Sequence, residues 1–142
     1  MISSPVIVLD ASAALAVLLA ESEGDAVEKK IRAIISSNGQ IFVPGLFWYE
    51  FGNGLLSAER RERITPDVRI TAAKNFTQLP IVTDQIPDFS IFNSIMNLAC
   101  ELALSYYDAA YLELAIRHEI PLLSCDDHFL TLKSRYALIL SI

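Results

Sequence analysis

Four acidic residues, Asp10, Glu50, Asp108 and Asp126, each fall where a predicted element begins or ends. Converging carboxylates suit hard, oxygen-seeking cations such as Mg²⁺ or Mn²⁺. Two such ions about 3.5–4 Å apart can activate a water molecule and stabilise the leaving oxygen of a phosphodiester. Chemistry of this kind needs no serine or histidine nucleophile, and a sequence with 2 histidines and no triad signature fits it.

Each acid also has a structural interpretation. Asp108 and Asp126 precede or open predicted helices, where a carboxylate can serve as a cap or as a partner of the helix dipole. Glu50 lies among aromatic residues, where a carboxylate needs a partner. Asp10 closes an apolar strand, and no Lys or Arg occurs between Met1 and Glu28 to form a local ion pair. A metal ion would provide the missing positive charge.

The pattern of apolar residues predicts strands that alternate with helices, which is typical of a parallel sheet covered on both faces. In such a sheet, functional residues gather at the carboxyl ends of the strands. We therefore expect one three-layer α/β/α domain over residues 1–142. The predicted strands are Pro5–Asp10, Ile41–Pro44, Leu79–Thr83, Pro121–Ser124 and Ala137–Leu140. The predicted helices are Ala11–Glu21, Asp25–Ser37, Leu46–Arg61, Pro66–Gln78, Pro87–Leu104, Tyr107–His118 and Asp126–Leu132.

Composition limits the protein classes. A hydrophobic fraction of 53% in 142 residues allows one sizeable core with apolar surface left over, which indicates a partner interface. The apolar run Val6–Ala20 is shorter than a spanning helix of about 20 residues and contains Asp10. The 2 cysteines form no disulfide framework, so we expect a cytoplasmic protein without a membrane anchor. A net charge of −6 disfavours nucleic acid unless bound cations change the local balance.

Four segments around these acids resemble the PIN-domain family, and within it the VapC-like toxins of toxin–antitoxin pairs. The segments are VIVLDASAALAVLL, PGLFWYEFGNGLL, LSYYDAAYLELA and PLLSCDDHF. Their order, spacing and predicted structural context all match. The resemblance covers essentially the whole chain.

The resemblance implies a metal-dependent ribonuclease with strand order 3-2-1-4-5, which would place the first and fourth strands side by side. It implies Asp10, Glu50, Asp108 and Asp126 as metal ligands for one or two ions. Ser12 matches a small hydroxyl residue that supports the first acid, and Asn53 a polar position one turn after Glu50. It further implies an RNA substrate, with transfer RNA among the family's targets, an antitoxin partner and a homodimer.

Four further features stay open at this point. Asp127 adjoins Asp126 and could share its role, although register favours Asp126. His128 could be an additional ligand, but hard-metal sites rarely need imidazole, so a surface or capping role is favoured. Arg60, Arg61 and Arg63 form the densest basic patch, which is either a solvated helix end or a contact for RNA phosphates. The aromatic residues Phe47, Trp48, Tyr49 and Phe51 suit core or dimer packing better than stacking of bases.

Other functions fit less well. A receiver-type phosphoacceptor needs a lysine after its last strand, and a dehalogenase-type phosphatase needs a second aspartate where Ser12 stands. A PIN fold that acts outside a toxin–antitoxin pair, or only as an interaction module, remains the main alternative. An inactive module should have an incomplete set of acids, and this set is complete.

Overall fold

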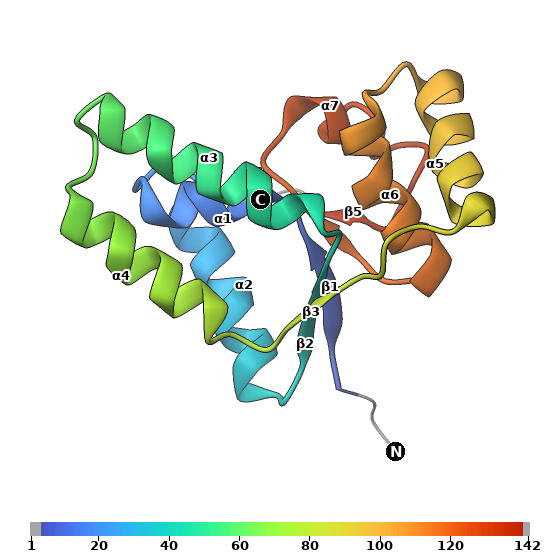
Figure 1. The fold of residues 1–142 in the computed structure, drawn as a ribbon. Coiled ribbons are helices and arrows are strands. Elements are labelled where there is room, and N and C mark those ends of the chain that lie inside the picture. The colour runs from blue at the N-terminus through green and yellow to red at the C-terminus, as the bar shows by residue number, and fades with distance from the viewer. Residues whose placement is uncertain (1–3, 141–142) are drawn as a thin grey trace.

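The computed structural model describes residues 4–140 as a central sheet between two layers of helices (Figure 1). The sheet contains β1 (Val6–Leu9), β2 (Gln40–Val43), β3 (Ile81–Thr83), β4 (Leu122–Leu123) and β5 (Ile139–Leu140). Its order is β3-β2-β1-β4-β5, and all four pairings are parallel. The predicted three-layer fold and its strand order are therefore confirmed.

Seven helices connect these strands in the described part of the chain. They are α1 (Ala11–Leu18), α2 (Gly24–Ser36), α3 (Leu46–Arg60), α4 (Pro66–Thr77), α5 (Phe89–Leu102), α6 (Tyr106–His118) and α7 (Asp127–Leu130). In Figure 1, α1, α2 and α4 lie on one side of the sheet, and α5 and α6 lie on the other. Within residues 4–140, no helix is both long enough and apolar enough to cross a membrane.

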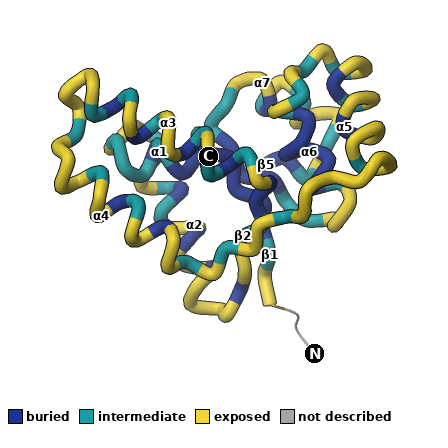
Figure 2. The backbone as a smooth tube through the Cα atoms, viewed as in Figure 1, coloured by how far each residue is buried: buried dark blue, intermediate teal, exposed yellow. Residues whose placement is uncertain are grey.

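The core follows from the apolar strands. Val8, Leu9 and Ile41 are completely or almost completely buried because helices cover the central strands on both faces. Figure 2 shows the same contrast, with buried central segments and largely exposed outer helices. The core therefore fixes the carboxyl ends of β1 and β4, where Asp10 and Asp126 follow.

Two features of the fold bring distant acids together. β1 and β4 pair with Leu9 opposite Leu123, so Asp10 and the segment after β4 leave the sheet at the same level. Helices α1 and α3 approach closely at Gly54, where an added Cβ would lie 2.3 Å from Leu15 Cδ1. This contact holds the helix that carries Glu50 against the helix that follows Asp10.

Candidate metal centre

Asp10 is the buried acid of the candidate site, with 5% of its surface exposed. Its backbone amide donates to the carbonyl of Leu123 at 3.1 Å, which extends the pairing of β1 with β4. Its Oδ2 atom accepts hydrogen bonds from Ser124 Oγ at 2.6 Å and from Ser12 Oγ at 2.7 Å. Two hydroxyls therefore fix the carboxylate, one from its own helix and one from the neighbouring strand end.

Ser124 also joins Asp10 to Asp126. Its Oγ accepts a hydrogen bond from the backbone amide of Asp126 at 2.9 Å. Ser12 Oγ accepts from the amide of Cys125 at 3.2 Å. The loop after β4 is thus held to the start of α1, and Asp126 is oriented by the same serine that contacts Asp10.

Burial raises the pKa of Asp10, and the nearby charge of Asp126 raises it further, while the serine hydroxyls act in the opposite direction. An ionised carboxylate in this position is costly unless a cation or strong donors stabilise it. The serines supply part of that stabilisation. The raised pKa shows that they do not supply all of it.

Glu50 lies in α3 and is half-buried. Its Oε1 atom accepts a hydrogen bond of 2.7 Å from the hydroxyl of Tyr111, a fully buried residue of α6. Burial raises the pKa of Glu50, followed by repulsion from Asp10, Asp108 and Asp126, whereas the Tyr111 hydrogen bond lowers it. The four predicted acids therefore act on one another electrostatically.

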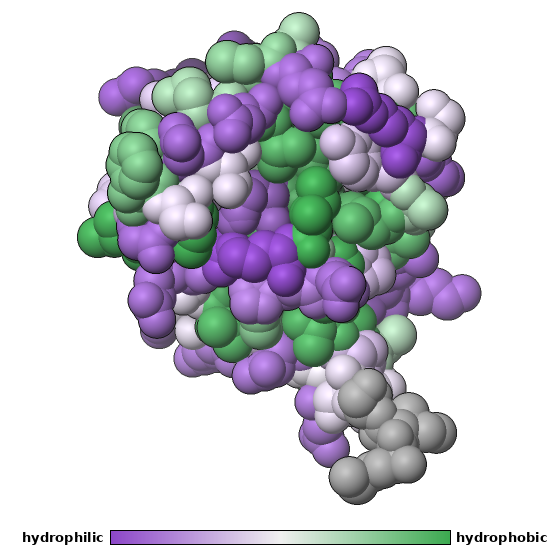
Figure 3. Space-filling model, turned by 90° about the vertical axis from the view of Figure 1, so that its right-hand side faces the viewer, coloured by the Kyte–Doolittle hydropathy of each residue, from purple (hydrophilic) through white to green (hydrophobic). Residues whose placement is uncertain are grey.

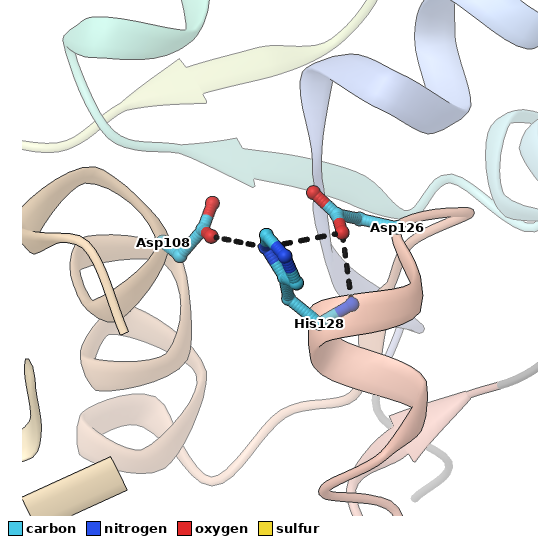
Figure 4. A group of neighbouring side chains, drawn as sticks. All are labelled: Asp108, Asp126 and His128. Atoms are coloured by element: carbon cyan, nitrogen blue, oxygen red, sulfur yellow. Dashed lines mark hydrogen bonds and ion pairs between the residues drawn. The ribbon is translucent and has the colours of Figure 1, made fainter. Parts of the chain in front are cut away.

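Asp108 and Asp126 face each other across His128 (Figure 4). His128 Nδ1 lies 3.3 Å from Asp108 Oδ2 and 3.6 Å from Asp126 Oδ1. One ligand atom from each of the three residues can be chosen so that all lie within 4.8 Å of one another. Ligand atoms this close together allow one cation to contact more than one of these three residues.

The sequence suggested a helix-capping role for both Asp108 and Asp126, and the structure shows that role for Asp126 alone of the two. Ser105 caps α6, since its Oγ accepts from the amide of Asp108 at 3.0 Å, so Asp108 is not the cap of α6. Asp126 does cap α7, because its Oδ1 accepts from the amide of His128 at 2.9 Å. Asp126 therefore combines a capping role with a place in the acidic cluster.

The remaining predicted residues lie around this centre. Asp127 and Asn53 are exposed, and Asp127 stands outside the cluster formed by Asp108, Asp126 and His128. Arg60, Arg61 and Arg63 are exposed at the other end of α3, and Arg63 lies 3.8 Å from Glu21. At a rise of about 1.5 Å per residue, Arg60 is about 15 Å along the helix from Glu50.

Three residues near the acids are not predicted as part of the site by sequence, namely Tyr111, Ser124 and His128. The sequence pattern places Tyr111 inside the predicted helix Tyr107–His118 and Ser124 at the end of the predicted strand Pro121–Ser124. It favours a surface or capping role for His128, which is exposed, yet the His128 ring lies between Asp108 and Asp126. A polar residue at the end of an otherwise apolar strand is the one available signal for Ser124.

The chemistry of the donors fits a divalent metal ion. The acids offer carboxylate oxygens, and their immediate partners are hydroxyls, one backbone amide and one imidazole. Arginines form ion pairs elsewhere, as Arg117 does with Asp84 at 2.5 Å and with Glu113 at 2.8 Å. A bound cation would offset both the cost of ionising the buried Asp10 carboxylate and the repulsion of Glu50 by the other acids.

Comparisons with known proteins identify a family and a fold. The PIN domain family matches residues 7–134. The fold is similar to the crystal structure of PAE2754 from Pyrobaculum aerophilum, at 22% identity and a TM-score of 0.67, covering 90% of this chain and 84% of that one. It is also similar to VapC20 of Mycobacterium tuberculosis, described as a sarcin-ricin loop cleaving toxin, at 14% identity and a TM-score of 0.61, covering 88% and 94%. A search of curated proteins gives no match.

Proposed function

The chain belongs to the PIN-domain family, and we propose that it is a metal-dependent endoribonuclease whose ligands are Asp10, Glu50, Asp108 and Asp126. The observation that carries this proposal is the convergence of these acids. Ser124 contacts both Asp10 and Asp126, the His128 ring lies between Asp108 and Asp126, and Glu50 is near enough for the other three acids to repel it. Unrelated surface carboxylates would spread apart to avoid that repulsion. Here the fold holds the four acids close together. A divalent cation bound among them would replace their mutual repulsion with attraction to the ion.

The proposed cofactor is Mg²⁺ or Mn²⁺, as one or two ions. Such an ion lowers the pKa of a water molecule and stabilises the charge that develops on the leaving oxygen. The four acids would hold it, with His128 Nδ1 as an additional donor beside Asp108 and Asp126. Ser12 and Ser124 orient Asp10, and Tyr111 orients Glu50.

RNA is the proposed substrate, with transfer RNA among the candidates. Arg60, Arg61 and Arg63 are proposed to contact phosphates away from the cleavage site, because they are exposed at the far end of the helix that carries Glu50. Asn53 lies one turn after Glu50 on α3 and is proposed to contact the substrate or a bound water. Asp127 is proposed as a neighbour of the site rather than a ligand.

We further propose that the protein acts in the cytoplasm as the toxin of a type II toxin–antitoxin pair, with an antitoxin as partner. The resemblance of its motifs to VapC-like toxins supports this role. The alternative is a PIN-fold nuclease outside such a pair. A catalytically inactive interaction module is less compatible with a complete set of acids.

The experiment is a cleavage assay with purified protein, structured RNA and either Mg²⁺ or Mn²⁺, in the presence and absence of EDTA. Asp10→Asn is the test variant, because it keeps the shape and a hydrogen-bond acceptor for the serines. Asp127→Asn is the matched control, since it removes an exposed carboxylate next to the site. We expect cleavage by the wild type and by Asp127→Asn, and none by Asp10→Asn or with EDTA. Equal cleavage by wild type and Asp10→Asn, or no cleavage by either in Mn²⁺, would contradict the proposal.

A further inference from the structure

His128 differs from the four acids of the candidate centre because it offers a nitrogen rather than an oxygen. Its Nδ1 atom faces two carboxylates at once, Asp108 Oδ2 at 3.3 Å and Asp126 Oδ1 at 3.6 Å (Figure 4). The chain has 2 histidines, and the other, His118, packs its ring edge-to-face against the ring of Phe42. His128 is therefore the imidazole that the fold brings to the acids.

The two Nδ1 distances suit ligands of a common ion better than a hydrogen bond. An N–H donor and a carboxylate oxygen are usually about 2.7–3.2 Å apart, and both distances exceed that range. Ligand atoms bound at about 2.1 Å to one divalent ion lie roughly 3.0 Å apart at octahedral angles and roughly 3.4 Å apart at tetrahedral angles. An ion between His128, Asp108 and Asp126 therefore needs only small movements of these side chains.

The backbone on either side of His128 is fixed, although 72% of its side chain is exposed. Ser124 Oγ accepts a hydrogen bond from the amide of Asp126 at 2.9 Å, and Asp126 Oδ1 accepts one from the amide of His128 at 2.9 Å. The next residue, Phe129, is fully buried, and its ring packs against that of Tyr111. The start of α7 is thus anchored to both the acidic centre and the core, while the exposed ring leaves an ion a path from solvent.

A cavity of about 240 Å³ adjoins this group, and Asp108 and His128 belong to its lining. The end of α5, the start of α6 and the residues after α7 form the other walls. The side of the molecule that carries α5 and α6 mixes polar and apolar side chains (Figure 3). The cavity lining does the same, with Ser105 and Thr131 beside Leu104. Since a water molecule occupies about 30 Å³ of the liquid, the cavity has room for waters that a bound divalent ion retains.

A nitrogen ligand changes which ions a site prefers. Mg²⁺ binds an octahedron of oxygen atoms and keeps several waters. Imidazole suits transition metals, and affinity for a given mixed site rises from Mn²⁺ to Co²⁺ along the first row. Two carboxylates and one imidazole therefore favour a transition-metal ion over Mg²⁺. Three protein ligands also leave a coordination position open for water, as in catalytic zinc sites.

We propose that His128 Nδ1 binds the metal ion together with Asp108 and Asp126, and that it thereby selects a divalent transition-metal ion over Mg²⁺. The inference rests on the proposed function, whose four acids form the rest of the centre, and it adds the identity of the ion. The acids alone do not distinguish Mg²⁺ from Mn²⁺ by ligand type, because all their ligand atoms are oxygens. The imidazole supplies that distinction.

A surface ion pair, the simpler role for His128, makes a different prediction. In that case the ring would turn away from the acids when an ion binds to them. No nitrogen would then contact the ion, and the preference among ions would not depend on His128. A measurement of nitrogen at the bound ion therefore separates the two roles.

The first experiment adds Mn²⁺ to the chain, prepared without a histidine tag, and records electron spin echo envelope modulation. This signal reports ¹⁴N of an imidazole bound to the ion. The test variant is His128→Ala. The matched control is His118→Ala, which removes the other imidazole. Both positions are exposed, so circular dichroism should show unchanged folding.

The second experiment compares the affinities for Co²⁺, Mn²⁺ and Mg²⁺ by calorimetric titration at one pH. His128→Ala should lose at least about 10-fold in Co²⁺ affinity, because even a group that only orients a ligand contributes about 10–100-fold. The loss should be smaller for Mn²⁺ and absent for Mg²⁺, in the order in which these ions favour imidazole. His118→Ala should bind all three ions as the wild type does.

We expect ¹⁴N modulation in the wild type and in His118→Ala, and none in His128→Ala. A wild-type Mn²⁺ complex without ¹⁴N modulation, or equal losses of Co²⁺ and Mg²⁺ affinity in His128→Ala, would overturn the proposal. Neither readout requires cleavage of RNA. Nitrogen-bound Mn²⁺ in a chain that cuts no RNA would contradict the nuclease function and support this inference. RNA cleavage with Mn²⁺ held by oxygens alone would do the reverse.

Discussion

The hydroxyl of Tyr111, a fully buried residue of α6, donates a hydrogen bond of 2.7 Å to Oε1 of Glu50 in α3. The two residues are 61 positions apart in the sequence. Burial and the nearby carboxylates raise the pKa of Tyr111, so its hydroxyl stays protonated and keeps its role as donor. The contact fixes the direction of a carboxylate that three other acids repel.

Tyr111→Phe should therefore weaken metal binding while leaving the fold intact. Loss of a group that orients a ligand lowers metal affinity by about 10–100-fold. A Mn²⁺ titration followed by electron paramagnetic resonance measures the change. Tyr106→Phe is the matched control on the same helix, because no described residue accepts or donates a hydrogen bond to the buried Tyr106 hydroxyl. An equal loss of affinity in both variants would argue against orientation by Tyr111.

Asp126→Asn and Asp127→Asn test which of two neighbouring acids serves as the proposed metal ligand. Asp126 lies in the cluster with Asp108 and His128, whereas Asp127 is exposed outside it. We expect Asp126→Asn to lose at least about 10-fold in Mn²⁺ affinity. Asp127→Asn should bind as the wild type does. Calorimetric titration measures both, and the opposite order of affinities would assign the role to Asp127.

The contribution of Asp10 and Glu50 to the stability of the metal-free protein should fall as pH rises. The pKa values of Asp10 and Glu50 are raised above their ordinary values of 3.8 and 4.5, so the folded chain binds protons more tightly than the unfolded chain. The penalty of ionising them is absent below the ordinary values and complete above the raised ones. Thermal unfolding in EDTA should therefore show that Asp10→Asn gains on the wild type with increasing pH. In saturating Mn²⁺ the wild type should instead be more stable than Asp10→Asn. A stability difference between the two that does not change with pH in EDTA would refute the raised pKa of Asp10.

Ser124→Ala should destabilise the protein. The variant removes the buried donor to Asp10 Oδ2 and the acceptor for the amide of Asp126. Leaving such groups unsatisfied costs about 1–3 kcal/mol. Urea unfolding measures this loss, with Ser12→Ala as the comparison, because Ser12 is less buried and should cost less. A larger loss in Ser12→Ala would show that the Ser12 hydroxyl is the main donor to Asp10.

The arginine cluster should act through salt-sensitive binding. In RNA-binding assays, Arg60→Ala combined with Arg61→Ala should reduce the slope of log affinity against log salt by about 1 for each phosphate that the variant no longer neutralises. Arg32→Ala is the control, since Arg32 pairs with Glu28 on α2 and is exposed. An unchanged slope would leave the cluster as a solvated helix end.

Local sequence patterns predicted the elements well, because apolar strands and capped helices leave clear signals. The helix predicted over Pro87–Leu104 is α5 at Phe89–Leu102, and Asp88 caps it through the amide of Ile91. The strand predicted over Ala137–Leu140 shortens to Ile139–Leu140, since only these residues pair with β4. Such boundaries depend on neighbouring strands rather than on local preference.

The candidate site was predictable as four acids, but the groups around them were not. Tyr111 and Ser124 approach Glu50 and Asp10 only after distant segments pack together. The aromatic run in α3 shows the same limit. Phe47 and Phe51 are buried, Trp48 donates to Thr83 Oγ1 at 2.9 Å, and Tyr49 is exposed. The buried pair follows the helical spacing that continues at Leu55, but nothing local to the sequence indicates the contact of Trp48 with Thr83.

The hydrogen bond from Ser124 to Asp10 has a consequence for the order in which the chain is made. The two residues are 114 positions apart, and Ser124 reaches Asp10 only when β4 has paired with β1. A growing or truncated chain that ends before residue 124 therefore lacks both this donor and Asp126. In the proposed nuclease, activity would therefore arise only after the segment through Asp126 has been synthesised.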